Sequence, residues 1–170
     1  IGIAASPMTA QERISWLRAR GPATGEGILA IADAFNSLGQ PDQMIATARA
    51  AWRDRALSDQ NARALQALYG QYLTAEDHYQ RVDMLLWRRN ITEARTLPGR
   101  LDSNRRKPVD ARIALMQNQG NVDALVQAVP ASMQDDAGLL HERARWRERR
   151  GQTQGELELL LRIRGSDARE

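Results

Sequence analysis

Two histidines, His78 and His141, are the only imidazole side chains in this chain of 170 residues, and no cysteine accompanies them. His141 and Glu142 begin the pattern of a helical zinc protease, which needs a second histidine one turn later, but that position holds Arg145. His78 has no second histidine nearby in the sequence. The absence of cysteine also excludes disulfides, thiolate zinc sites and thiol catalysis. We therefore predict no metal ligands, and we expect both histidines to lie at the surface or to cap helices.

The carboxylates, serines and glycines do not form the arrangements that acid–base, nucleophilic or phosphate chemistry requires. Acidic residues that are adjacent or two apart on a helix do not face each other. The neighbouring acids are Glu76 and Asp77, Asp135 and Asp136, and Glu156 and Glu158. No serine has the Gly-x-Ser-x-Gly setting of a hydrolase nucleophile. Gly21, Gly25 and Gly27 precede a predicted helix without a following Lys-Ser or Lys-Thr, so a flexible turn is expected there and an anion site is the alternative. No catalytic and no cofactor-binding residue is predicted.

Tryptophans are the remaining residues with a chemical use. Each of the four lies within or beside a helical apolar stripe: Trp16, Trp52, Trp87 and Trp146. Packing between helices explains such positions, and an aromatic platform on which a sugar stacks is the alternative.

The charge of the chain excludes some partners. Of the 24 basic residues 23 are arginines, against 21 acidic residues, and the excess lies after residue 85, where 16 basic residues stand against 12 acidic ones. The dense stretches 100–107 and 143–150 indicate solvated helix faces with ion pairs, so no nucleic-acid partner is predicted.

No apolar run approaches the roughly 20 residues of a membrane span. The chain begins at Ile1 without a signal-peptide pattern, which fits a processed mature protein or an excised fragment.

The elements that must position these side chains are helices, because Ala, Leu, Arg, Gln and Glu dominate and no stretch alternates in the manner of a strand. Capping residues or a proline precede most of the apolar stripes, and glycine or proline ends most of them. The ten predicted helices start near Thr9, Thr24, Pro41, Ser58, Thr74, Thr92, Val109, Asn121, Asp135 and Thr153. Leu38 and Leu68 are placed on inward-facing stripes.

A weak repeat relates three of the helix pairs. Leu85-Leu86-Trp87, then Asn90 and Glu93-Ala94, matches two later segments at spacings of 29 and 30 residues. These segments are Ala114-Leu115-Met116 with Gly120 and Asp123-Ala124, and Ala144-Arg145-Trp146 with Gly151 and Gly155-Glu156. This spacing is the length of one helix pair, which buries its apolar face against its neighbours. We predict one all-α domain over 1–170, an α-solenoid superhelix of about ten antiparallel helices in hairpins like those of tetratricopeptide repeats, clearest over 75–165. An irregular helical bundle is the alternative.

The segment 69–87 predicts a junction between helices. Gly70 ends one helix, and Thr74 with Asp77 satisfies the first amides of the next. Arg81 is expected to pair with Asp77 four residues earlier. One face carries, at i, i+4 and i+8, Tyr79, Asp83 and Trp87. These residues indicate a structural joint, so none is assigned a catalytic role.

The same segment resembles the superhelical region of the soluble lytic murein transglycosylases. The matching elements are Tyr69-Gly70, Leu73-Thr74, Asp77-His78, Arg81 and Leu85-Leu86-Trp87. Further similar stretches are Ala48-Arg49-Ala50-Ala51-Trp52, Leu57-Ser58, Ala94-Arg95 and Ala111-Arg112-Ile113-Ala114-Leu115. The resemblance covers roughly residues 28–165 and is strongest over 48–116.

The resemblance implies a periplasmic location and a noncatalytic scaffold. In that family the enzyme cleaves the MurNAc–GlcNAc bonds of peptidoglycan and leaves 1,6-anhydro ends. Its acid–base glutamate, followed by serine, lies in a separate lysozyme-like domain. None of the nine glutamates here precedes a serine, so this chain alone is predicted to be inactive and the parent enzyme active. The implied partners are the catalytic domain in cis and the glycan strands of peptidoglycan. The alternative function is a stand-alone protein–protein interaction module built from tetratricopeptide-like helix pairs.

Overall fold

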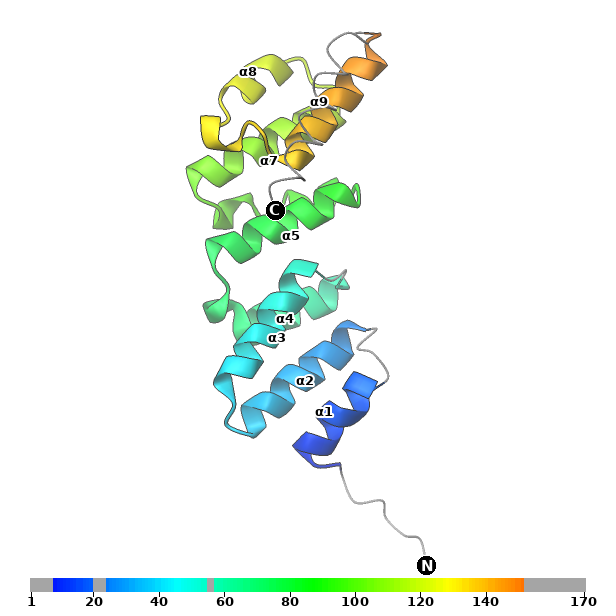
Figure 1. The fold of residues 1–170 in the computed structure, drawn as a ribbon, viewed down its shortest axis with the longest axis vertical. Helices are drawn as coiled ribbons and strands as arrows, with labels where there is room; N and C mark the ends of the chain where they lie inside the picture. The colour runs from blue at the N-terminus through cyan, green and yellow to red at the C-terminus, as the bar shows by residue number, and fades with distance from the viewer. Residues whose placement is uncertain (1–7, 20–23, 55–56, 152–170) are drawn as a thin grey trace, which may run out of the picture. The chain divides into compact units, whose positions relative to one another are not determined.

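A computed structural model describes residues 8–19, 24–54 and 57–151 (Figure 1). All regular structure in these residues is helical, with nine α-helices and three short 3-10 helices. The all-α prediction is therefore confirmed. The helix predicted to start at Thr153 lies outside the described residues.

The chain divides into two compact units, Ile1–His78 and Tyr79–Glu170, and the boundary falls inside one helix, α5. The first unit contains α1 (Ala10–Ala19), α2 (Gly25–Ser37), α3 (Pro41–Asp54), α4 (Asp59–Tyr69), a 3-10 turn at Gly70–Tyr72 and the start of α5 (Ala75–Trp87). The second contains the rest of α5, α6 (Ile91–Ala94), α7 (Ser103–Met116), α8 (Val122–Gln127) and α9 (Ala137–Arg149), with 3-10 turns at Pro98–Arg100 and Ala131–Met133. The single superhelical domain stays a prediction.

In the first unit α2 lies against α1 and α3, and α4 packs against both α2 and α3 (Figure 1). The predicted starts of these helices are confirmed by their caps. Thr9 and Glu12 form a reciprocal capping box, and the hydroxyls of Thr24 and Ser58 accept hydrogen bonds from backbone amides three residues later. The core side chains include Ile28, Ile31, Phe35, Met44, Ala48, Trp52 and Leu65. The predicted apolar stripes of α2 and α3 thus face each other.

In the second unit α7 packs against both α8 and α9. Their shared core consists of Ala111, Ala114, Leu115, Val122, Val129, Leu139 and Trp146. The indole Nε1 of Trp146 donates a hydrogen bond to Asn118 Oδ1 at 3.1 Å. Arg149 Nη2 donates to the Leu115 carbonyl at 2.8 Å, so α9 is attached to the C-terminal end of α7.

Helices α2, α5 and α7 end in the same hydrogen-bonded turn. A backbone amide donates to the carbonyl five residues earlier, in the pairs Gln40–Phe35, Asn90–Leu85 and Gln119–Ala114. The residue before each amide has a positive φ, namely Gly39 (65°), Arg89 (62°) and Asn118 (52°). This Schellman motif satisfies the last carbonyls of the helix and turns the chain into the next helix within a few residues.

These turns support a repeat-like helical architecture. In these turns Asn90 and Gln119 hold equivalent positions, because each amide donates to the carbonyl five residues earlier. The predicted repeat matches Asn90 with Gly120, one residue later. Three hydrogen-bonded pairs have similar separations of 28 or 29 residues, against the predicted spacings of 29 and 30: Arg49 with Asp77, Asp83 with Arg112, and Asn118 with Trp146. The superhelical arrangement of the pairs stays a prediction.

The structure corrects three predicted helix starts. Helix α7 begins at Ser103 and not at Val109, because Asp102 Oδ1 accepts from the Arg105 amide at 2.9 Å and the helix then continues through the buried Pro108. Proline is costly inside a helix, and here the burial of the following turns offsets that cost. The caps of α6 and α9 are Asn90 and Asp136, not Thr92 and Asp135.

The structure also corrects the burial of several apolar residues. Trp52 and Trp146 are buried as expected, but Trp16 and Trp87 are 48% and 47% exposed. Leu38 and Leu68, predicted to face inward, are also exposed. Leu38 caps the end of α2, where the helical stripe no longer continues. Three of these four exposed residues, Leu38, Leu68 and Trp87, lie at the C-terminal ends of their helices.

Replacing Asn118 with glycine should destabilise the second unit by about 1 kcal/mol, although glycine adopts a positive φ more easily than asparagine. The loss comes from the indole of Trp146, which is left without its hydrogen-bond acceptor in a partly buried position. Urea unfolding followed by tryptophan fluorescence measures the change. A gain in stability would show that backbone strain at residue 118 outweighs this bond.

Candidate functional site

The segment 69–87 forms a buried ionic joint at the start of α5. Asp77 Oδ2 accepts hydrogen bonds at 2.8 Å from the backbone amide and the hydroxyl of Thr74, which closes the predicted capping box. The same oxygen accepts from Arg49 Nε at 2.8 Å, and Arg53 Nε lies 3.7 Å from the other oxygen. Asp77 is fully buried, so its carboxylate fastens the first turn of α5 to α3.

The expected pair between Arg81 and Asp77 is wrong. Arg81, which is buried, forms its ion pair with Glu93 at the end of α6. The carboxylate of Asp77 is already occupied by Arg49, which lies 28 residues earlier in the sequence. Arg81 therefore joins α5 to α6, and Asp77 joins α5 to α3.

A third joint surrounds Arg112 on α7. Its guanidinium pairs with Asp83 on α5 and lies 5.6 Å from the centroid of the Trp87 ring. On its other side it touches α9, where a Cβ built on Gly138 would lie 2.5 Å from Arg112 Nη1. Arg112 is 1% exposed, so its guanidinium is enclosed by α5 and α9. Sequence reasoning missed this site, although a glycine in a helix indicates a close approach by another group.

The predicted face of α5 at i, i+4 and i+8 is confirmed by its contacts in the second unit. Tyr79 Oη donates to Asp136 Oδ2 at 3.4 Å, Asp83 pairs with Arg112, and the ring centroid of Trp87 lies 5.0 Å from that of His141. This face thus meets α7 and the start of α9.

Trp87 is the centre of a surface group that we call the Trp87 cluster: Asp83, Trp87, Arg89, Arg112, His141 and Glu142. Arg89 Nη1 donates to the buried Glu142 Oε2 at 2.9 Å, beside the contact between Trp87 and His141. Burial lowers the pKa of His141, Glu142 partly opposes this shift, and neighbouring arginines add to it. The imidazole is therefore neutral at pH 7. The cluster combines an exposed indole with fixed charged groups.

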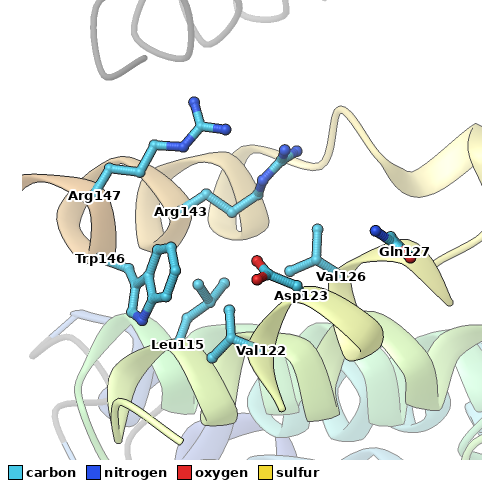
Figure 2. Close-up of a pocket in the computed structure, with 8 residues that line it drawn as sticks. All are labelled: Leu115, Val122, Asp123, Val126, Gln127, Arg143, Trp146 and Arg147. Atoms are coloured by element: carbon cyan, nitrogen blue, oxygen red, sulfur yellow. The ribbon is translucent and has the colours of Figure 1, made fainter. Parts of the chain in front are cut away.

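A cavity of about 140 Å³ lies between α8 and α9 (Figure 2). Leu115, Val122 and Trp146 form its apolar part. Figure 2 shows Asp123, Val126 and Gln127 approaching from α8, and Arg143 and Arg147 extending from α9. The cavity has the size of a single apolar side chain and has charges of both signs at its rim.

The structure does not bring the other chemical candidates together. His78, expected at the surface or in a helix cap, is instead buried and packs edge-on against Trp52 in the first unit, with ring centroids 5.6 Å apart. His141 belongs to the second unit. In the described parts of the chain no three His, Asp or Glu side chains are grouped to hold a metal ion. The Gly27 amide at the start of α2 is bonded to the Thr24 hydroxyl, while Gly21, Glu156 and Glu158 lie outside the described residues.

The described residues thus form an all-helical, repeat-like fold with buried ionic joints between the helices. Comparison with protein-family models, with curated proteins and with solved structures finds no match to this chain. No helix in the described ranges has the length and apolar character that crossing a membrane requires.

Proposed function

We propose that this chain is the noncatalytic helical scaffold of a soluble lytic peptidoglycan transglycosylase, located in the periplasm and attached to a lysozyme-like catalytic domain. One observation carries the proposal. Six polar or charged side chains are buried among the described residues: Asn61, Asp77, His78, Arg81, Arg112 and Glu142. Four of them, residues 77, 78, 81 and 112, lie in the segments that resemble that family.

The contacts of these residues support a structural role. Each ion pair joins two different helices: Asp77 joins α5 to α3, Arg81 joins α5 to α6, and Arg112 joins α7 to α5. A buried ion pair contributes little net stability, but it penalises other arrangements of the helices that would leave a charge unpaired. A scaffold that holds a catalytic domain and guides glycan strands requires one such fixed arrangement.

The same residues are unsuited to catalysis by proton transfer. Burial raises the pKa of Asp77, but hydrogen bonds from Thr74 and Arg49 outweigh this effect and leave the pKa below its usual value. A general acid needs a pKa near the working pH. None of the nine glutamates here precedes a serine, so the proposal places the acid–base glutamate of the enzyme in a separate lysozyme-like domain.

We expect purified residues 1–170 to release no 1,6-anhydro-muropeptides from isolated sacculi, because the acid–base glutamate is missing. Mass spectrometry of the soluble products measures this, with a complete lytic transglycosylase as the positive control. Release of anhydro products by residues 1–170 would contradict the proposal. The reading frame beyond Glu170 gives a second test, since the proposal requires a lysozyme-like domain with a Glu-Ser pair.

The cavity between α8 and α9 favours a second candidate, a protein–protein interaction module. Its apolar floor accepts one side chain of a peptide, and its charged rim can bind the peptide's polar groups. Pull-down of a protein partner that Val126→Asp abolishes, without binding to sacculi, would favour this function over the scaffold.

A further inference from the structure

We propose that the Trp87 cluster is a binding site for one neutral pyranose ring of a glycan strand. This inference rests on the proposed function, because it names the residues with which the scaffold touches peptidoglycan.

The exposed indole of Trp87 provides an apolar surface on which one sugar ring can stack. It is 47% exposed, and in the described part of the second unit it is the one large apolar side chain with such exposure. A protein partner usually buries a larger contiguous apolar patch. A β-linked N-acetylhexosamine presents axial C–H bonds on its ring faces, and these pack against a single indole face.

The indole is also held in place before any ligand binds. The His141 ring, tilted by 43°, and the guanidinium of Arg112 both contact it, and Arg112 is fixed by its ion pair with Asp83. A ring fixed in this way loses little conformational freedom on binding, which favours affinity.

Two partly exposed polar side chains are paired with residues of the cluster that lie at or beside the ring contacts. The side chains of Asp83 and Arg89 are 37% and 41% exposed, and each is oriented by a buried partner, Arg112 or Glu142. A carboxylate and a guanidinium can accept and donate hydrogen bonds to sugar hydroxyl and acetamido groups. Within the six residues of the cluster the two acids offset the two arginines, and Arg145, which also acts on His141, adds one positive charge. A net charge this small suits a neutral sugar, whereas the phosphates of a nucleic acid need a larger positive excess.

A β-1,4-linked N-acetylglucosamine tetramer tests the site directly. Its binding to residues 1–170 is measured by calorimetry and by the shift of the Trp87 indole N–H signal in NMR spectra. We expect Trp87→Ala to weaken binding about tenfold or more, as loss of an aromatic stacking contact does, and Trp87→Phe to keep most of the affinity. Trp16→Ala is the matched control, because Trp16 is exposed to the same extent in the first unit, and we expect an unchanged affinity. Circular dichroism and urea midpoints confirm that each variant is folded.

The outcomes separate this inference from the proposed function. A wild-type chain that binds no tetramer, an affinity that Trp87→Ala leaves unchanged, or tighter binding of a single-stranded oligonucleotide at the same residue overturns the inference. If sacculi are still bound in these cases, the scaffold function stands. Loss of tetramer binding in Trp87→Ala supports the glycan site, even if no lysozyme-like domain follows Glu170.

Discussion

Replacing Gly138 with alanine should destabilise the second unit by about 2 kcal/mol, whereas the same change at an open helical position stabilises by up to about 1 kcal/mol. The added Cβ would occupy the position of the Arg112 guanidinium. That group cannot move aside cheaply, because it is buried, paired with Asp83 and in contact with the Trp87 ring. Urea unfolding of residues 1–170 measures the loss.

A double-mutant cycle assigns this effect to Arg112. In the background of Arg112→Ala, Gly138→Ala should be neutral or stabilising, which gives a coupling energy of about 2 kcal/mol. Gly99→Ala is the control, because a Cβ at Gly99 would meet nothing within 4 Å, and we expect a change within about 0.5 kcal/mol. Additive effects at 112 and 138 would show that the guanidinium does not occupy this position.

Replacing Asp77 with alanine should cost about 3 kcal/mol at pH 7, because it removes a helix cap and the buried partner of Arg49. Asp77→Asn should cost less, since the amide oxygen can still accept from Thr74 while the charge is lost. Hydrogen exchange of residues 75–87, followed by mass spectrometry, measures the effect locally.

The contribution of Asp77 also depends on pH. Its pKa is lower in the folded chain than its usual value, so its stabilising effect is complete above about pH 4 and disappears as the pH falls through the folded-state pKa. The difference in stability between wild type and Asp77→Asn should therefore shrink on acidification. Glu12→Gln is the matched control, because Glu12 closes the same kind of box with Thr9 at the surface and without an arginine, so its effect should be smaller. Equal losses for the two variants would contradict the role of burial and of Arg49.

Local patterns in the sequence predict all nine described helices, although three of the predicted starts are wrong. Ser58 and Thr24 mark starts that the backbone amides confirm, and Gly39 marks an end. These signals are reliable because a cap is satisfied by residues within one turn. The predicted start of α7 at Val109 is wrong because a local pattern does not include tertiary packing. Proline is unfavourable inside a helix, and packing of the helix offsets the cost of Pro108.

The candidate site was predicted in part. The face of Tyr79, Asp83 and Trp87 followed from helical periodicity, and the sugar-stacking alternative pointed to tryptophan. The partners of these residues did not follow, because Arg112 is 29 residues away from Asp83 and no local pattern selects one arginine among 23. The repeat period of 29 to 30 residues contained this information, since it indicates which residues become neighbours.

Helix α5 limits how the chain can be dissected. The boundary between the units falls between His78 and Tyr79, so a cut there would divide a continuous helix after its first turn. The N-terminal piece would keep Asp77 but lose the turns that propagate from its cap. The C-terminal piece would keep Arg81 and Asp83 on a helix without a start. The two units are therefore not domains that could be exchanged separately between genes. A recombination event that preserved the fold would have to keep α5 intact on one side of the exchange point.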